Sequence, residues 1–156
     1  MVMIMEIKEF STEYVSDVAE IERACFSNPW DETVIEEELK NECSHLYVAV
    51  QGNRAVGYAM LYIVCGEADI IRVAVLPEYR RQGIAEKLLL KSFEVNETDA
   101  VFLDVRESNA PAIRLYQTLG FADTGVRKNY YSNPTENAIL MKKEFGNGEK
   151  GKKKDC

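Results

Sequence analysis

The chain has 156 residues, of which 46% are apolar and 29% charged, and its formal net charge is −7. This composition is typical of one globular domain that buries a substantial core. An acidic chain lacks the basic face that nucleic acids require, so we expect no specific nucleic-acid partner. No apolar run is long enough to cross a bilayer and no basic leader is present, so we expect a cytoplasmic protein without a membrane partner.

Cysteine and histidine are too sparse to suggest a metal site. The four cysteines are scattered without a C-x-x-C pair, and the chain has one histidine. A tetrahedral site needs several such ligands at short spacings, so we expect no bound metal.

The first elements follow from alternation and helix signals. Apolar and charged residues alternate from Ile4 to Lys8, which predicts a strand. Ser11 or Thr12 is expected to cap a helix whose apolar face runs from Tyr14 to Cys25. Pro29 then interrupts the helical pattern.

A second helix and a β-hairpin are expected next. Asp31 has the position of a helix cap, and the apolar spacing continues to Leu39. Two apolar runs, Leu46–Val50 and Ala55–Val64, flank Gly52-Asn53, which predicts a hairpin.

A strand, a basic turn with one glycine and a helix come next. The strand is Glu67–Val75, the turn is Arg80–Ala85, and the helix runs from Glu86 to Phe93. A helix that begins directly after such a turn directs unpaired N–H groups and the positive end of its dipole at one point, which favours phosphate binding. The turn contains neither the Walker pattern nor the three-glycine dinucleotide pattern, and a glycine at this place can also serve only the turn.

The remaining elements complete an α/β domain. After a strand at Ala100–Val105, Asn109 or Ser108 is expected to cap a helix that ends at Gly120. Phe121–Tyr131 and Ala138 to Lys143 then predict two more strands. We expect one domain over residues 1–145, a mixed sheet with helices on both faces, and a flexible lysine-rich tail over 146–156.

Two segments resemble the GCN5-related N-acetyltransferase (GNAT) superfamily. Arg80, Gly83 and Ala85 fill the pattern Arg/Gln-x-x-Gly-x-Gly/Ala of its acyl-CoA pyrophosphate loop. The stretch from Leu103 to Phe121 reads LDVRESNAPAIRLYQTLGF, and it resembles the LEVRxSNxxAIxLYxxLGF segment of the RimI-type enzymes. The resemblance extends to Pro29-Trp30, Arg127–Tyr131 and Glu136–Met141.

The resemblance implies a fold and a reaction. The fold would be a single domain with a mixed, mostly antiparallel sheet of about seven strands, about four helices, and a V-shaped splay between the fourth and fifth strands. The reaction would move an acetyl group from acetyl-CoA, as co-substrate, to the N-terminal alanine of ribosomal protein S18. The oligomeric state stays open.

The resemblance also places the cofactor. The pantetheine arm would add main-chain hydrogen bonds to one strand, the turn would hold the diphosphate, and Asn109 would hold the pantetheine or simply cap its helix. The expected cofactor contacts are Ile71, Val73, Val75, Arg80, Arg81, Gln82, Gly83, Ile84, Ala85 and Asn109.

Acetyl transfer to an amine needs a base for the ammonium proton and an acid for the departing thiolate. In the RimI-type family the position of Tyr116 is the proton donor, and it lies two helical turns from Asn109 on the same face. The family's base is a glutamate, whereas this chain has Asp104, whose carboxylate would lie ~1.5 Å further back. Glu67 and Asp69 are alternative bases that act through water.

By the same resemblance, the acceptor is contacted by Trp30 and by Tyr130 or Tyr131. Adjacent residues of a strand point to opposite faces, so at most one of the two tyrosines is expected to face the acceptor. Two alternatives stay open: the acceptor is a lysine side chain or a small amine, or the domain binds CoA without catalysis.

Overall fold

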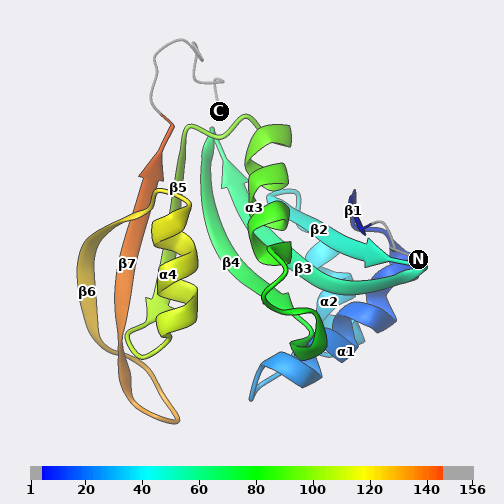
Figure 1. The fold of residues 1–156 in the computed structure, drawn as a ribbon, viewed down its shortest axis with the longest axis horizontal. Helices are drawn as coiled ribbons and strands as arrows, with labels where there is room; N and C mark the ends of the chain where they lie inside the picture. Colours follow the sequence, from blue (N-terminus) through cyan, green and yellow to red (C-terminus); the bar gives the residue numbers. More distant parts are fainter. Residues whose placement is uncertain (1–4, 146–156) are drawn as a thin grey trace. The chain divides into compact units, whose positions relative to one another are not determined.

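The computed structural model describes residues 5–145, so the predicted tail at 146–156 lies outside the described residues. None of the helices in this range has the length and apolar character needed to span a membrane. Two short 3-10 turns, η1 and η2, accompany four α-helices and seven strands (Figure 1). The elements are β1 (Met5–Glu9), η1 (Thr12–Tyr14), α1 (Val15–Cys25), α2 (Glu32–Leu39), β2 (Ser44–Gln51), β3 (Arg54–Val64), β4 (Glu67–Val75), η2 (Pro77–Tyr79), α3 (Ile84–Val95), β5 (Ala100–Arg106), α4 (Ala110–Thr118), β6 (Ala122–Tyr131) and β7 (Glu136–Glu144).

The seven strands form one mixed sheet in the order β1-β2-β3-β4-β5-β7-β6. The pairs β1–β2, β2–β3, β5–β7 and β6–β7 are antiparallel, whereas β4 and β5 are parallel, with Glu67 opposite Ala100 and Asp69 opposite Phe102. The predicted mixed, mostly antiparallel sheet with four helices is therefore confirmed. The splay between β4 and β5 stays a prediction.

The chain divides into two compact units, and each is described by itself. Unit 1 comprises residues up to 63 and residues 71–96, and unit 2 comprises residues 64–70 and those from 97 onward. The boundary falls inside β4, whose first residues belong to unit 2 and whose last residues belong to unit 1.

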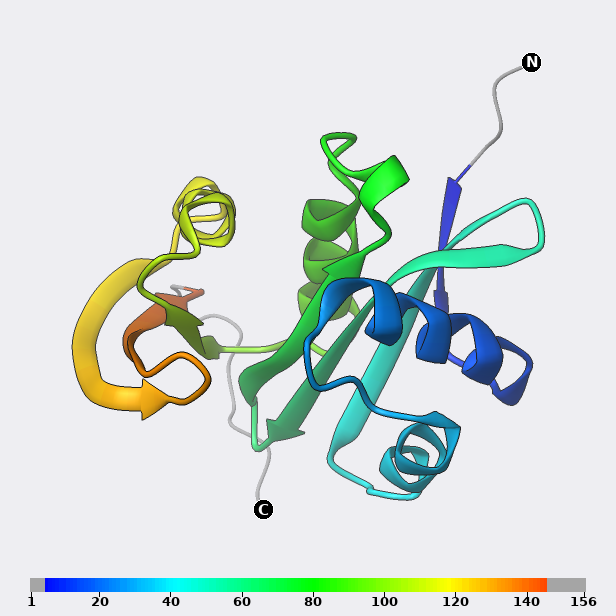
Figure 2. The same cartoon turned by 90° about the horizontal axis from the view of Figure 1, so that it is seen from below.

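Unit 1 has helices on both faces of its strands. In Figures 1 and 2, α1 and α2 lie on one face of β2 and β3, and α3 lies on the other. Because β2 and β3 are covered on both faces, the residues in the middle of both strands are buried without inside–outside alternation, as their apolar runs suggested. The largest wholly buried side chains of this unit include Ile21, Ile35, Val48, Tyr58, Met60, Leu61, Leu88 and Leu89.

Unit 2 is a smaller layer in which α4 lies over one face of β5 and β7 (Figure 2). Strand β6 stands at the end of the sheet and is largely exposed. The buried side chains of this unit include Val101, Leu103, Val105, Tyr116, Leu119, Phe121, Ala138 and Met141.

Two of the three predicted helix caps are confirmed. Asp31 accepts a hydrogen bond from the Val34 N–H at 3.0 Å, and Asn109 accepts one from the Ala112 N–H at 3.3 Å. The expected cap of α1 is wrong, because η1 precedes that helix and Ser11 donates its hydroxyl to Glu13 at 3.2 Å instead. The hydroxyl therefore does not cap the turn's N–H groups.

Candidate active site

The basic turn of unit 1 has the backbone conformation that its glycine suggested. Arg81 and Gly83 take left-handed φ values of 64° and 75°, and Gly83 is the residue that precedes the first turn of α3. A Cβ built on Gly83 would meet no atom within 4 Å, so the backbone conformation rather than space favours glycine here. The first bond of the helix runs from the Lys87 N–H to the Gly83 carbonyl at 3.1 Å.

This geometry makes the turn suitable for an anion. The N–H groups ahead of Lys87 point out of the helix start, and Gly83 has no side chain with which to cap them. Arg81, Gln82 and Gly83 are exposed, so a diphosphate can reach the main chain. Ile84 is 2% exposed, so its side chain is not available to a ligand.

Arg80 fastens the turn to the end of β4. Its Nε donates to the Val75 carbonyl at 3.0 Å, and its Nη2 donates to Cys25 Sγ at 3.4 Å. The thiol of Cys25 donates to the same carbonyl at 3.4 Å. A pantetheine bond to the Val75 carbonyl would therefore displace one of these donors, whereas Ile71 and Val73 are not subject to this competition and are partly exposed.

A glycine that our sequence analysis did not single out lets the turn approach the sheet. A Cβ on Gly57 of β3 would lie 3.1 Å from the Ala74 carbonyl oxygen, 3.2 Å from Val75 Cγ2 and 3.4 Å from Ile84 Cγ2. Such contacts are tighter than those of most real side chains, so α3 begins this close to β3 because residue 57 has no Cβ. A glycine inside an otherwise apolar strand was the available signal.

Unit 1 also contains a buried charged cluster that the sequence analysis missed. Glu22 of α1 is 0% exposed, and its carboxylate accepts hydrogen bonds from the Tyr58 hydroxyl and from the Trp30 N–H, the latter at 2.8 Å. Arg72 of β4 approaches the same carboxylate at 3.6 Å. Burial and the neighbouring Glu22 raise the pKa of the Tyr58 hydroxyl, which therefore stays a donor.

The guanidinium of Arg72 lies between two aromatic rings. It is 4.2 Å from the centre of the Phe26 ring and 4.3 Å from that of Trp30. We call Arg72, Phe26 and Trp30 the arginine stack. The sequence signal for this cluster was Glu22, a glutamate on the inner face of a helix, four residues before the aromatic segment that begins at Phe26.

The predicted base lies in a group of carboxylates in unit 2. Asp104 is exposed on β5, and its charge acts on Asp69 of β4, which lies opposite Phe102, two residues before Asp104. Partial burial first, and then the charges of Asp104 and Glu67, raise the pKa of Asp69 above its ordinary value. Asp104 and Glu67 thus both act on Asp69 within unit 2.

Two tyrosines of unit 2 are electrostatically linked to this group. Burial, followed by the charge of Asp104, raises the pKa of Tyr131 to about 12. Burial and the neighbouring Tyr131 raise the pKa of Tyr116, which is 6% exposed. Tyr116 also packs edge-on against Phe121, with ring centres 5.6 Å apart. The structure therefore associates Asp104, Tyr131 and Tyr116 electrostatically.

The expectation that Tyr130 and Tyr131 point to opposite faces is wrong. Their rings meet edge-on with centres 5.1 Å apart. The regular alternation fails because Asn129 takes a left-handed φ of 53° and the β6–β7 register shifts between Arg127 and Tyr131. Tyr130 is 48% exposed, whereas Tyr131 is half-buried beside Asp104.

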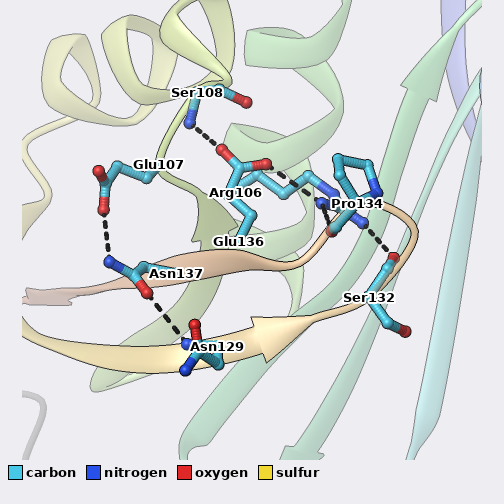
Figure 3. A network of polar contacts seen from close by, with 8 residues as sticks. All are labelled: Arg106, Glu107, Ser108, Asn129, Ser132, Pro134, Glu136 and Asn137. Carbon is cyan, nitrogen blue, oxygen red and sulfur yellow. Dashed lines mark hydrogen bonds and ion pairs between the residues drawn. The ribbon is translucent and has the colours of Figure 1, made fainter.

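Arg106 anchors the loop that joins β6 to β7 (Figure 3). Its guanidinium donates to Glu136 and to the carbonyls of Pro134 and Ser132, each at 3.1 Å, and it lies 4.5 Å from the centre of the Tyr131 ring. We call Arg106 with these four partners the loop clamp.

A second contact links the loop clamp to the chain ahead of α4. The Glu136 carboxylate accepts from the Ser108 N–H at 2.6 Å, and hydrogen bonds from Ser108 together with Arg106 lower the pKa of that carboxyl. Beside it, Asn137 donates to Glu107 at 3.1 Å and accepts from the Asn129 N–H at 3.0 Å (Figure 3). Asn137 of β7 thus fixes the position of Asn129, the left-handed residue that precedes Tyr130.

The chain matches a family model and named relatives. The model of the Acetyltransferase (GNAT) family matches residues 15–121. A Bacillus subtilis (strain 168) protein, provisionally named a ribosomal protein bS18-alanine N-acetyltransferase, is 36% identical over 139 residues, covering 86% of this chain and 92% of the relative. The Escherichia coli (strain K12) ribosomal protein bS18-alanine N-acetyltransferase is 33% identical over 126 residues, covering 78% and 84%.

Solved structures give the same result. The ribosomal-protein-S18-alanine N-acetyltransferase of Escherichia coli superposes with a TM-score of 0.81 at 30% identity, covering 89% of this chain and 92% of that one. Ard1 from Thermoplasma volcanium gives a TM-score of 0.80 at 27% identity, covering 92% and 99%. The matched residues include the basic turn and the segment up to Phe121. The chain belongs to the GNAT family of acetyltransferases, which take their acetyl group from acetyl-CoA.

Proposed function

We propose that this enzyme acetylates the N-terminal amine of a polypeptide, with the N-terminal alanine of ribosomal protein S18 as the candidate acceptor. The relatives at 33% and 36% identity are named for that activity and match most of the chain. The observation that carries the proposal is this similarity over most of the chain, supported by the position of Asp104 and Tyr116 in the segment that resembles the RimI-type enzymes.

The basic turn would hold the diphosphate of acetyl-CoA. Its exposed main chain at Arg81, Gln82 and Gly83 and the start of α3 supply N–H donors and a favourable dipole. Arg80 would act mainly by fixing the turn, because its side chain is bound to Val75 and Cys25. Ile71 and Val73 would offer main-chain bonds to the pantetheine, as Ala85 would to the diphosphate.

Asp104 would take the proton of the acceptor ammonium, directly or through a water. The free amine then attacks the thioester carbonyl, and the carbon–sulfur bond breaks after a tetrahedral intermediate. Asp69 is an alternative base, because its raised pKa makes its carboxylate more basic than that of an ordinary aspartate, and Glu67 is another.

Tyr116 would return a proton to the thiolate that leaves. A tyrosine hydroxyl is protonated at neutral pH, and burial raises its pKa further, so the hydroxyl has a proton to donate but is a weaker acid than an exposed tyrosine. Asn109 keeps its place at the start of the same helix, where its side chain caps Ala112, and a pantetheine contact there would share that oxygen or use the amide nitrogen.

By the same resemblance, Trp30 and Tyr131 are the candidate acceptor contacts. Tyr131 is preferred over Tyr130 because the charge of Asp104 acts on Tyr131. Tyr130, which is 48% exposed, would contact only the outer residues of a peptide. The proposal further treats residues 1–145 as one acetyltransferase domain that works in the cytoplasm, where ribosomal proteins are made.

The test uses a peptide that starts Ala-Arg, offered with a free or a formylated N-terminus and with or without an internal lysine. Release of CoA thiol is followed together with the mass of the peptide. Thiol released only with a free N-terminus supports the proposal. Release with a formylated peptide that contains lysine would establish a lysine acetyltransferase instead. CoA binding without release under any acceptor would establish a non-catalytic module.

A further inference from the structure

The arginine stack joins the segment between α1 and α2 to the strand β4. Phe26 and Trp30 lie at the two ends of this segment, and both rings contact the guanidinium of Arg72. Ser27, Asn28 and Pro29 between them are exposed. The segment is therefore held at its ends and open to solvent in its middle.

Arg72 occupies a position next to the predicted pantetheine strand contacts. In a strand, alternate residues share a face, so Ile71 and Val73 project away from the side chain of Arg72. The side chain of Arg72 is 18% exposed and lies with the aromatic segment and Glu22. One residue of β4 thus ties the open segment to the strand proposed to hold the thioester arm.

The buried carboxylate beneath the stack is costly to maintain. Glu22 is 0% exposed and has partners on three different parts of unit 1, at Tyr58, Trp30 and Arg72. Replacing a buried ion pair by apolar residues is often neutral or stabilising, so burial of this pair is poorly explained by stability alone. What it does supply is orientation, because a carboxylate with three fixed donors determines where Trp30 and Arg72 lie.

We propose that Arg72 is a positioning residue for the acceptor polypeptide, which it serves by holding Phe26 and Trp30 so that the segment between them presents a fixed edge to the acceptor. The inference rests on the proposed function, since it requires an acceptor that contacts this segment. A planar guanidinium is needed, because only a flat cation stacks on both rings while it pairs with Glu22.

The test compares Arg72→Lys with the wild-type protein. Lysine keeps a positive charge near Glu22, so the variant folds, but it cannot stack on two rings. We expect the KM for the Ala-Arg peptide to rise about fivefold to tenfold, corresponding to the loss of part of the stacking energy. The KM for acetyl-CoA should change less than about twofold. Arg54→Lys is the matched control, because Arg54 forms an exposed pair with Glu20 in the same unit.

A second measurement does not depend on turnover. Trp30 is the sole tryptophan of the chain, so its emission and its quenching by acrylamide report on the stack alone. Arg72→Lys should make Trp30 more accessible to acrylamide, whereas Arg54→Lys should not. This measurement needs no acceptor, so it separates the two hypotheses. A wild-type protein that is inactive on every N-terminal peptide would overturn the proposed function, and acrylamide quenching would still show whether Arg72 holds Trp30.

Three results would overturn the inference. If Arg72→Lys changes neither the acrylamide quenching of Trp30 nor the KM for the peptide, the guanidinium does not fix the position of Trp30. Altered quenching with an unchanged peptide KM would show a stack that does not serve the acceptor. Equal rises in the KM for peptide and acetyl-CoA, together with a lower Tm, would show general loosening of unit 1 instead of positioning.

Discussion

Each unit places an arginine against an aromatic ring and a glutamate, but the two settings differ. In unit 1 the guanidinium of Arg72 lies between Phe26 and Trp30 and pairs with Glu22, which is 0% exposed. In unit 2, Arg106 lies on Tyr131 and pairs with Glu136, and the two charged side chains are 32% and 16% exposed.

The difference in burial decides what each pair contributes. Water can replace the partners of Arg106, so the loop clamp orders a surface loop at small gain in stability. Water cannot reach Glu22, so loss of any partner leaves a buried charge or hydroxyl uncompensated. Buried polar groups thus support the frame of unit 1, whereas Asp104 of unit 2, the proposed base, is exposed.

The largest effect is expected at Glu22. Glu22→Ala removes the acceptor of Tyr58, Trp30 and Arg72 at once, and should lower the free energy of unfolding by about 3–5 kcal/mol. Urea titration followed by circular dichroism measures it. Glu20→Ala on the same helix, which loses only an exposed pair with Arg54, should cost under about 1 kcal/mol. If Glu22→Ala and Glu20→Ala lower the free energy of unfolding equally, burial does not decide what the two glutamates contribute to stability.

Asp104→Asn tests the chemical side of the comparison. Turnover of the acceptor peptide at pH 7 should fall about 100-fold, because a general base contributes roughly two to four orders of magnitude. The KM for acetyl-CoA and the Tm should stay close to wild type, since Asp104 is exposed. Wild-type turnover would transfer the base role to Asp69, Glu67 or bulk water.

Arg106→Met should destabilise the protein much less than Glu22→Ala does. The variant loses one ion pair and two bonds to loop carbonyls at a partly exposed site, for which about 1–2 kcal/mol is expected. Arg127→Met is the control, because that guanidinium lies 5.4 Å from the Tyr130 ring and should contribute under about 0.5 kcal/mol. A cost as large as that of Glu22→Ala would contradict the role given to burial.

The smallest effect is expected at Asp69. Its pKa is raised in the folded protein, so its ionised form is disfavoured and stability is lost as the pH rises through that raised pKa. Asp69→Asn removes repulsion from Asp104 and Glu67 and should stabilise the protein by about 0.2–0.5 kcal/mol at pH 7. At pH 3, below the ordinary value of 3.8, the gain should vanish. A gain that persists at pH 3 would have another origin. The Tm of Asp69→Asn and of the wild-type protein, measured at pH 7 and at pH 3, distinguishes these two outcomes.

Local patterns in the sequence were sufficient to predict most of the elements. The hairpin at Gly52, the caps at Asp31 and Asn109, and the strand-turn-helix around Gly83 depend on neighbouring residues, and all four features are present. Such features are predictable because their hydrogen bonds span a few positions along the chain.

The features that were missed depend on distant residues or on an irregular backbone. Tyr58 reaches Glu22 across 36 positions, and Arg72 joins them from a third element, so no window of sequence contains the cluster. The contact between Tyr130 and Tyr131 follows from one left-handed residue, Asn129, which alternation cannot anticipate.

Gly57 of β3 determines how closely the end of β4 and the start of α3, the proposed acetyl-CoA turn, can approach that strand. Any side chain there would push against Ala74, Val75 and Ile84, and so would separate the strand end from the first turn of α3. A screen for variants with weakened acetyl-CoA affinity should therefore recover substitutions at this buried residue alongside those of the turn itself. The geometry of the proposed phosphate-binding turn thus depends on a residue of β3 that has no side chain.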